Sequence, residues 1–228
     1  MTLLKTSVIS SLLLLLIGCG PSIPLRNGDR IVFFGDSITE QGMNPNGYIT
    51  LIKNELNARH PERKIDIVGA GISGNKVPDL LQRVGDDIID IRPTVVVIYI
   101  GINDVWHWAL PGHRGTPKDQ YEADLREVIA RIKYAGAKVI LCTPSVIGER
   151  SDGKNPQDAM LDEYADIDRK IVLDLGIHLC DLRKTFIDYL KVHNKEEKEK
   201  GVLTVDGVHL NDEGNKLVAD QILKLLES

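Results

Sequence analysis

The sequence has no internal repeat, no long run of basic residues and only three cysteines among its 228 residues. Phosphate binding needs clustered lysine and arginine, and this chain carries a formal net charge of -5. Both features argue against a nucleic-acid partner. The chain is also long enough to bury a sizeable core without crosslinks. We therefore expect one globular domain that does not bind nucleic acid.

The sequence also lacks residues at the spacings that are typical of metal ligands. Five of the six histidines have no cysteine or carboxylate at a spacing typical of metal sites. They are His60, His107, His113, His178 and His193. We expect no metal site and no cofactor built on these residues.

The first 18 residues have the pattern of an export signal. One basic residue, Lys5, precedes an apolar run over residues 12–17, which is too short to favour a retained membrane-spanning anchor. The run ends in Leu-Ile-Gly-Cys, which resembles the lipobox of bacterial lipoproteins and implies lipidation of Cys19. We expect a signal peptide over 1–18, a tether over 19–29 and a folded domain over 30–228. Acyl chains on Cys19 would then hold the domain at a membrane of the cell envelope.

The other two cysteines, Cys142 and Cys180, each close a predicted strand. Export permits a disulfide between them. Cysteines at apolar strand ends are more often buried free thiols, so we favour that state for both. Neither has a sequence context that suggests catalysis.

Strand-like and helix-like segments alternate from residue 30 onward. Short apolar runs predict strands over 32–34, 64–68, 94–100, 138–142 and 177–180. Amphipathic spacing predicts helices over 48–58, 78–89, 117–134, 155–175, 183–200 and from an N-cap at Asn211 to 226. This alternation produces a parallel sheet with helices on both faces. We predict a three-layer α/β/α sandwich of about five strands, with the β-branched segment 94–100 at its centre.

Three of the predicted strands end in loops that carry polar or glycine-rich stretches. Ser37 follows the first strand in Gly-Asp-Ser, Gly71 lies in the loop after the second, and Asn103 follows the third. The carboxyl ends of parallel strands share one edge of the sheet, where ligands bind. Taken alone, Ser37 is equally well explained as a nucleophile or as a helix cap. Together the loops offer a nucleophile and donors for an oxyanion, namely the N–H groups of Ser37 and Gly71 and the Asn103 amide.

A base for this serine is present near the end of the chain. Asp206 and His209 are three residues apart, a spacing of one turn that places both side chains on the same side. The carboxylate is then able to fix the imidazole tautomer while the other ring nitrogen faces Ser37. The alternative is a surface histidine that merely precedes a helix. We predict a Ser37–His209–Asp206 triad.

Four stretches of the sequence resemble, in the right order, the conserved blocks of the SGNH (GDSL-type) hydrolases. They are Gly35–Thr39, the Ala-Gly-Ile-Ser-Gly around Gly71, Gly101–Asp104 and Asp206–His209. The resemblance covers about residue 30 to the end of the chain. It implies a flavodoxin-like fold, a triad of Ser37, His209 and Asp206, an oxyanion hole of Ser37, Gly71 and Asn103, and no metal. We expect Asp36 to brace the first loop by hydrogen bonds.

The stretch that runs from Gly101 to Trp106 is similar to the third block of carbohydrate acetyl esterases in that family. The similarity suggests that Trp106 lines the substrate site, where tryptophan stacks on sugars or walls off a small acyl pocket. The predicted function is the removal of small acyl groups, above all acetyl groups, from a carbohydrate. Two alternatives stay open: a lysophospholipase or thioesterase of the same family, and a non-catalytic carbohydrate-binding surface lipoprotein.

Overall fold

A computed structural model describes residues 22–226, which form a five-stranded, wholly parallel sheet covered by helices. The strands are β1 (Arg30–Gly35), β2 (Asp66–Gly71), β3 (Val95–Tyr99), β4 (Lys138–Cys142) and β5 (His178–Cys180). Their order across the sheet is β2-β1-β3-β4-β5, with β3 in the middle as predicted. This strand order is that of flavodoxin-like folds. The chain places β2 on one side of β1 and then β3, β4 and β5 on the other side, so the direction in which strands are added reverses between β1 and β3.

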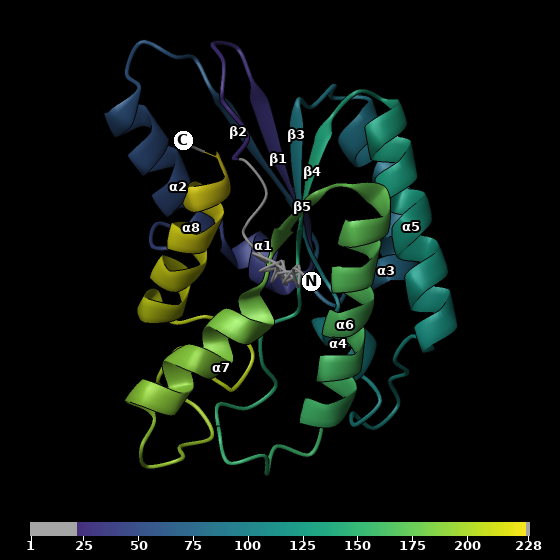
Figure 1. Cartoon of the computed structure of the whole chain (residues 1–228), viewed down its shortest axis with the longest axis vertical. Coiled ribbons are helices and arrows are strands. Elements are labelled where there is room, and N and C mark those ends of the chain that lie inside the picture. Colours follow the sequence, from purple (N-terminus) through teal and green to yellow (C-terminus); the bar gives the residue numbers. More distant parts are fainter. Residues whose placement is uncertain (1–21, 227–228) are drawn as a thin grey trace, which may run out of the picture.

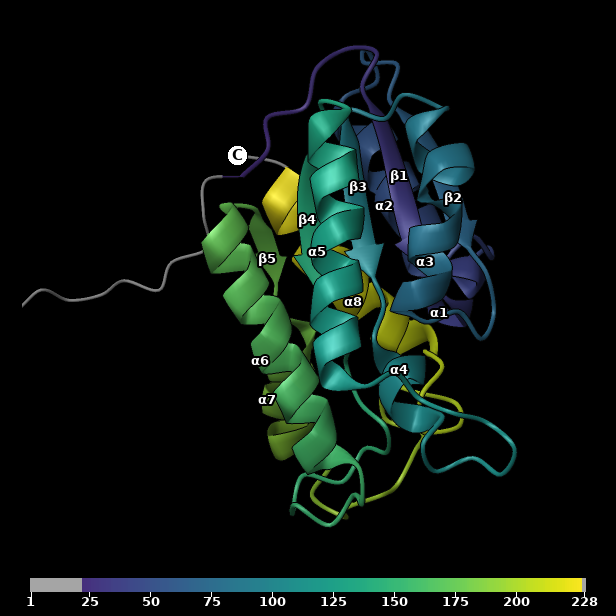
Figure 2. The same ribbon diagram turned by 90° about the vertical axis from the view of Figure 1, so that its right-hand side faces the viewer.

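The helices form two layers on either side of the sheet. Figure 1 shows α2 and α8 on one side and α3, α5 and α6 on the other, and Figure 2 looks onto the second of these layers, with α3 and α5 in front of the strands and α2 and α8 behind them. The helices are α1 (Ser37–Gln41), α2 (Tyr48–Arg59), α3 (Val77–Val84), the π-helix η1 (Gly85–Ile89), α4 (Ile102–Trp106), α5 (Lys118–Tyr134), α6 (Asp158–Leu175), α7 (Leu182–His193) and α8 (Asp212–Leu226). The predicted α/β/α sandwich is confirmed.

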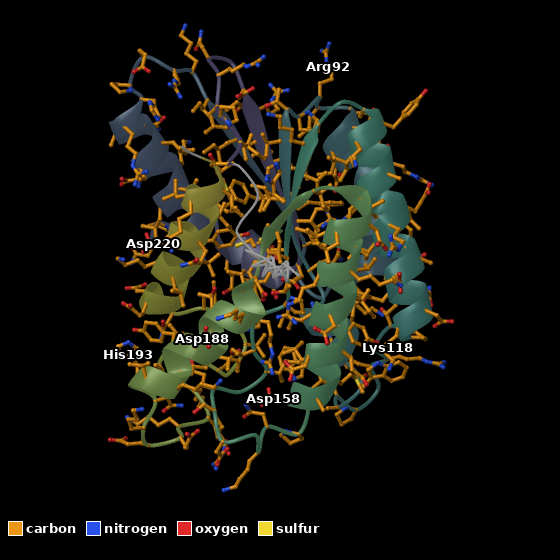
Figure 3. All side chains as sticks on the ribbon, in the orientation of Figure 1. Arg92, Lys118, Asp158, Asp188, His193 and Asp220 are labelled. Carbon is orange, nitrogen blue, oxygen red and sulfur yellow. The ribbon has the colours of Figure 1, made fainter. Side chains whose placement is uncertain are left out.

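The core lies on both faces of the two central strands. Every side chain over Ile31–Phe34 and Val95–Tyr99 is at most 1% exposed. These strands are continuous apolar runs because helices cover both of their faces. Figure 3 shows the opposite pattern on the surface, where Lys118, Asp188 and Asp220 project outward from α5, α7 and α8.

Several predicted boundaries are wrong. The helix predicted over 183–200 ends at His193. There the side chain of Asn194 donates to the carbonyls of Glu149 and Lys198 and accepts from the Lys198 N–H, and these bonds hold 194–198 as a turn. The second strand continues to Gly71, so the predicted glycine-rich turn is partly strand. The short helices α1 and α4 were not predicted, because five residues are too few to show a period.

The predicted tether extends onto the domain surface. Ile23 is 2% exposed, and its N–H donates to the Leu225 carbonyl at 2.7 Å. Leu25 is also buried. The predicted signal peptide and Cys19 lie outside the described residues. Within residues 22–226, no helix combines the length and the apolar character needed to cross a bilayer.

Cys142 and Cys180 are register partners on neighbouring strands β4 and β5. Both are buried, and both are free thiols, as predicted. Burial raises the pKa of the Cys142 thiol well above its usual value, with Cys180 adding to the effect. A buried, protonated thiol of this kind is chemically inert.

Candidate active site

Ser37 lies where β1 turns sharply into α1 at the carboxyl edge of the sheet. Asp36 is the N-cap of α1, and its Oδ1 accepts from the Ile38 N–H at 2.9 Å, which confirms the expected bracing role. The turn needs glycine at position 35, because a Cβ there would lie 2.2 Å from the Tyr99 carbonyl oxygen. The close packing of β1 against β3 therefore fixes the position of Ser37, the first residue of α1.

A chain of hydrogen bonds links Ser37 to the end of the sequence. Ser37 Oγ lies 2.9 Å from His209 Nε2, and His209 Nδ1 lies 2.7 Å from Asp206 Oδ2. An ionised Asp206 holds the proton on Nδ1, which leaves Nε2 to accept from the serine hydroxyl. The structure therefore brings together the three residues predicted as a triad, in the predicted order of contact.

Asp206 and His209 reach this geometry without a helix. They lie in the loop before α8, not on successive turns, so the helical argument from their spacing is wrong. Asp206 Oδ1 accepts from the backbone N–H groups of Val208 and His209 at 2.9 and 2.8 Å, which folds the loop around the carboxylate. Burial acts to raise the pKa of Asp206, but these bonds and the one from the imidazole outweigh it and hold the pKa below its usual value.

Gly71 and Asn103 lie at the carboxyl ends of the two strands that flank β1. Gly71 ends β2 in register with Gly35, and a Cβ on it would lie 2.1 Å from the Glu40 nitrogen of α1. Asn103 lies at the start of α4, is 4% exposed, and donates from Nδ2 to the Asn75 carbonyl at 3.0 Å. The amide nitrogen keeps a second hydrogen for another acceptor. Both residues therefore lie at the same sheet edge as Ser37.

Two further carboxyls are buried beneath this edge. Burial raises the pKa of Asp36 to about 7, and the neighbouring Asp104 adds to the rise. Burial likewise raises the pKa of Asp104 to about 6, against the lowering effect of its bond to the Val77 N–H. Asp104 Oδ1 accepts from that N–H at 3.1 Å and ties α3 to α4. The sequence signal for Asp104 is its place beside Asn103.

Trp106 ends α4 next to the candidate base. Its ring centroid lies 6.3 Å from that of His209, with the two planes at 71°. An edge-to-face contact of this kind limits how the imidazole can tilt. Trp108 is more exposed, and the guanidinium group of Arg114 lies over its ring. Of the two tryptophans, Trp106 is the one in ring contact with His209.

Two residues that no motif indicated support the site from outside. Glu149, fully buried, accepts from the backbone of 202–204, the segment that leads to Asp206. Arg83 on α3 donates to the carbonyls at the ends of β1 and β2. Neither shows a local signal, since most of the groups they bind are backbone atoms distant in sequence. Among residues 22–226, no group of three His, Cys, Asp or Glu side chains is arranged to hold a metal ion.

The arrangement suits acyl transfer to serine. A hydroxyl is hydrogen-bonded to an imidazole, a carboxylate orients that imidazole, and N–H donors lie at the same edge. These are the parts that activate a nucleophile and stabilise a developing oxyanion.

Comparison with known proteins supports the same chemistry. Residues 33–217 match the sequence profile of the family described as "GDSL-like Lipase/Acylhydrolase family". An acetylxylan esterase of Geobacillus stearothermophilus is 32% identical over 214 residues, which cover 88% of this chain and 94% of that protein. The crystal structure of an acetyl xylan esterase, AlAXEase, aligns with a TM-score of 0.83 and 44% identity, covering 86% of this chain and 98% of that one.

A relative with a different description covers a similar span. The uncharacterized lipoprotein YqeF of Bacillus subtilis (strain 168) is 25% identical over 223 residues, which cover 86% of this chain and 89% of that protein. Ser37, Gly71, Asn103, Asp206 and His209 all lie within the matched span 33–217.

Proposed function

The chain belongs to the GDSL-like lipase/acylhydrolase family and is a carboxylic ester hydrolase, and we propose that it removes acetyl groups from a carbohydrate through an acyl-enzyme on Ser37. The observation that carries the proposal is the continuous hydrogen-bond chain from Ser37 Oγ through His209 to Asp206. A serine held in this way is the usual nucleophile of ester hydrolysis.

In the first half of the reaction, Ser37 Oγ attacks the ester carbonyl carbon. His209 Nε2 takes the hydroxyl proton, and the resulting imidazolium is stabilised by Asp206 across the 2.7 Å contact. The carbonyl oxygen becomes an oxyanion, for which the Ser37 N–H and Asn103 Nδ2 serve as donors. Collapse of the tetrahedral intermediate breaks the ester bond, and the leaving alcohol receives the proton from His209.

In the second half, water replaces the alcohol. His209 Nε2 accepts a proton from the water as its oxygen attacks the acyl carbon, and a second oxyanion forms in the same place. Collapse of this intermediate releases the carboxylic acid and returns the proton to Ser37 Oγ. The residues named here balance the reaction without a metal or cofactor taking part.

The proposed substrate class rests on the relatives and on Trp106. Two of them are named as acetylxylan or acetyl xylan esterases. Trp106 beside His209 offers an aromatic wall close to the reacting centre, suited to a small acyl group or a sugar ring. We take Trp106 as the substrate-contacting residue.

The nucleophile is tested with Ser37→Ala and p-nitrophenyl acetate. We expect loss of turnover with unchanged far-UV circular dichroism, since the side chain shrinks by one oxygen atom. Ser73→Ala is the matched control, because Ser73 is an exposed serine on the loop that follows β2. A fully active Ser37→Ala enzyme would rule out the proposed mechanism.

The substrate is tested by comparing acyl chains and alcohols. We expect faster turnover of acetyl than octanoyl esters, and release of acetate from acetylated xylo-oligosaccharides. Preference for octanoyl esters would favour the lysophospholipase or thioesterase alternative. Sugar binding without turnover of any ester would favour a carbohydrate-binding protein.

We also propose that the protein is exported and held at the cell envelope through acyl chains on Cys19. Support comes from the signal pattern over residues 1–18 and from the lipoprotein relative YqeF. In cells expressing the full chain, the esterase should sediment with membranes, and Cys19→Ser should release it. Equal membrane association of both forms would refute lipid anchoring at this residue.

A further inference from the structure

The segment before β1 is bound to the domain at two points. The Ile23 N–H donates to the Leu225 carbonyl at 2.7 Å, and the Ile23 side chain is only 2% exposed. Leu25 is also buried, and its carbonyl accepts from Arg63 Nη1 at 3.1 Å. The start of the described chain is therefore docked on the domain and does not extend freely from it.

The docking point lies at the end of the molecule opposite the candidate active site. Helix α8 begins at Asp212, just after the loop that carries His209, and Leu225 follows thirteen residues later. At 1.5 Å per residue, Leu225 is about 20 Å from Asp212 along the helix axis. Figure 2 shows residues 22–29, in purple, crossing the end of the molecule at which the strands begin, whereas α1 and α4 lie at the other end.

The distance between Cys19 and this docking point is short. Three residues separate Cys19 from Ile23 in the sequence. The four steps from one α-carbon to the other span at most about 14 Å, even when the chain is fully extended. Acyl chains on Cys19 would insert in the bilayer and keep that residue at its surface. The end of the domain that carries Ile23 would then be the end nearest to the membrane.

The charge of this end suits a lipid surface. The segments that lead into the five strands, each counted with the first residue of its strand, contain six lysines or arginines and four aspartates or glutamates. These segments, which we call the amino edge, are 24–30, 60–66, 90–95, 135–138 and 176–178. Their net charge is +2, although the whole chain carries -5. Basic side chains are attracted to anionic headgroups, so the two ends of the domain are not equivalent toward a membrane.

The side chains at this end point the same way. Figure 3 shows Arg92 projecting from the amino edge, far from Asp158 at the opposite end of the molecule. Tyr134, the last residue of α5, is 97% exposed and directly precedes one of the amino-edge segments. Tyrosine is enriched at the headgroup level of bilayers, because its ring is apolar and its hydroxyl is polar.

We propose that the amino edge is a membrane-facing surface, and that the docked segment holds it on anionic lipid headgroups while Ser37 opens away from the bilayer. The proposal rests on the lipidation that we propose for Cys19. A lipid of the same membrane has to leave the bilayer and cover about 20 Å to reach Ser37. A carbohydrate outside the membrane meets the site directly, so this orientation selects carbohydrate esters over membrane lipids.

The orientation is tested by energy transfer from the protein to labelled lipids. The full-length lipidated protein is added to preformed vesicles of phosphatidylethanolamine and phosphatidylglycerol that carry an acceptor dye on their headgroups. The donor dye is attached to Arg92→Cys at the amino edge or to Lys154→Cys in the loop between β4 and α6. Both positions are exposed and both changes remove one positive charge, while Cys142 and Cys180 are buried.

We expect several-fold stronger energy transfer from position 92 than from position 154, because the two ends of the domain are separated by about 20 Å along α8. Equal transfer from both positions, or stronger transfer from position 154, would overturn the proposal. The role of the docked segment is tested by inserting about 20 glycine and serine residues after Gly20, which adds a flexible span of about 25 Å. This insertion should largely remove the difference between the two positions, and an undiminished difference would overturn that role.

The consequence for the substrate is measured on the same vesicles. The vesicle-bound protein and the Cys19→Ser protein should hydrolyse p-nitrophenyl acetate at the same rate. An octanoyl ester carried by a vesicle lipid should be cleaved no faster by the vesicle-bound protein, and faster cleavage would overturn the proposed orientation.

The outcomes separate this proposal from the proposed ester hydrolysis. Activity without Ser37 would refute the mechanism and leave the energy transfer from positions 92 and 154 unchanged. Equal energy transfer from an active enzyme would refute only the orientation. Failure of the full-length chain to bind vesicles would overturn the orientation together with lipid anchoring at Cys19.

Discussion

Glu149 should prove to be the most sensitive residue outside the reacting groups. Its carboxylate is fully buried and accepts from four donors in the loop that leads to the candidate base. Oε2 accepts from the Val202 N–H at 2.7 Å, and Oε1 accepts from the Leu203 N–H at 2.7 Å and from both the N–H and the hydroxyl of Thr204. The Thr204 hydroxyl in turn accepts from the Gly207 N–H at 3.0 Å, one residue after Asp206.

The size of the effect follows from counting these donors. Glu149→Ala leaves four buried donors without their acceptor, at about 1–3 kcal/mol each, so even with water entering the space we expect a loss of at least about 4 kcal/mol. That is a large part of the roughly 5–15 kcal/mol that stabilises a typical domain. Glu149→Gln keeps one oxygen with three donors and turns an NH₂ toward the Val202 N–H, so it should lose about 1–3 kcal/mol.

The measurement is the free energy of unfolding in urea, with kcat on p-nitrophenyl acetate measured in parallel. Because a displacement of about 1 Å in a catalytic group costs on the order of 10²-fold, Glu149→Gln should lower kcat by about tenfold or more even where it is folded. Glu197→Gln is the matched control. The Glu197 carboxylate is only partly buried and accepts from the N–H and hydroxyl of a single residue, Ser151. A Glu149→Gln protein within about 0.5 kcal/mol of the wild type would refute the reasoning.

Three more predictions concern the sheet edge. Asn103→Ala should lower kcat on p-nitrophenyl acetate by about 10²–10³ with little change in KM, and a kcat within fivefold would exclude Asn103 as an oxyanion donor. Gly71→Ala should lose activity and lower Tm, because its Cβ would lie 2.1 Å from the Glu40 nitrogen; an unchanged Tm by calorimetry would contradict this packing. Burial raises the pKa of Asp36 to about 7 in the folded protein, above about 4 when unfolded, so its contribution to stability is greatest in acid and falls as pH rises toward 7. The Asp36→Asn protein has no ionisable group at this position, so its Tm should rise relative to that of the wild type between pH 5 and pH 8. A Tm difference that stays constant over this range would refute the raised pKa of Asp36.

Local pattern predicted the strands better than the helix ends. The β-branched run Val95–Tyr99 had to be central, because only a strand covered on both faces tolerates five apolar residues in a row. The charged stretch 195–200 has good helix formers, and yet α7 ends at His193. The long-range contacts that help to end it come from Glu149, whose carbonyl accepts from the Asn194 side chain and whose N–H donates to the Glu199 carbonyl, and they are invisible to a local window.

The pairing of Asp206 with His209 shows how a correct conclusion can follow from an incorrect local geometry. The spacing of three suggested a helical turn, but the carboxylate instead binds two backbone N–H groups and folds the loop around itself. Both arrangements bring the side chains together, so the pattern predicted the contact and not the conformation.

Read alone, the chain already contained the reacting groups and their order: a serine after the first strand, an amide after the third, and a carboxylate three residues before a histidine. Those groups act through their side chains, two of them shortly after strands and two in the loop before the last helix, and such residues leave a readable signature. Arg83 and Glu149 left none, because most of the groups they bind are backbone atoms 13 to 55 residues away, and every residue type except proline offers the same carbonyl and N–H. Which backbone groups meet them is settled only when β1, β2 and the 199–209 loop come together in the folded protein.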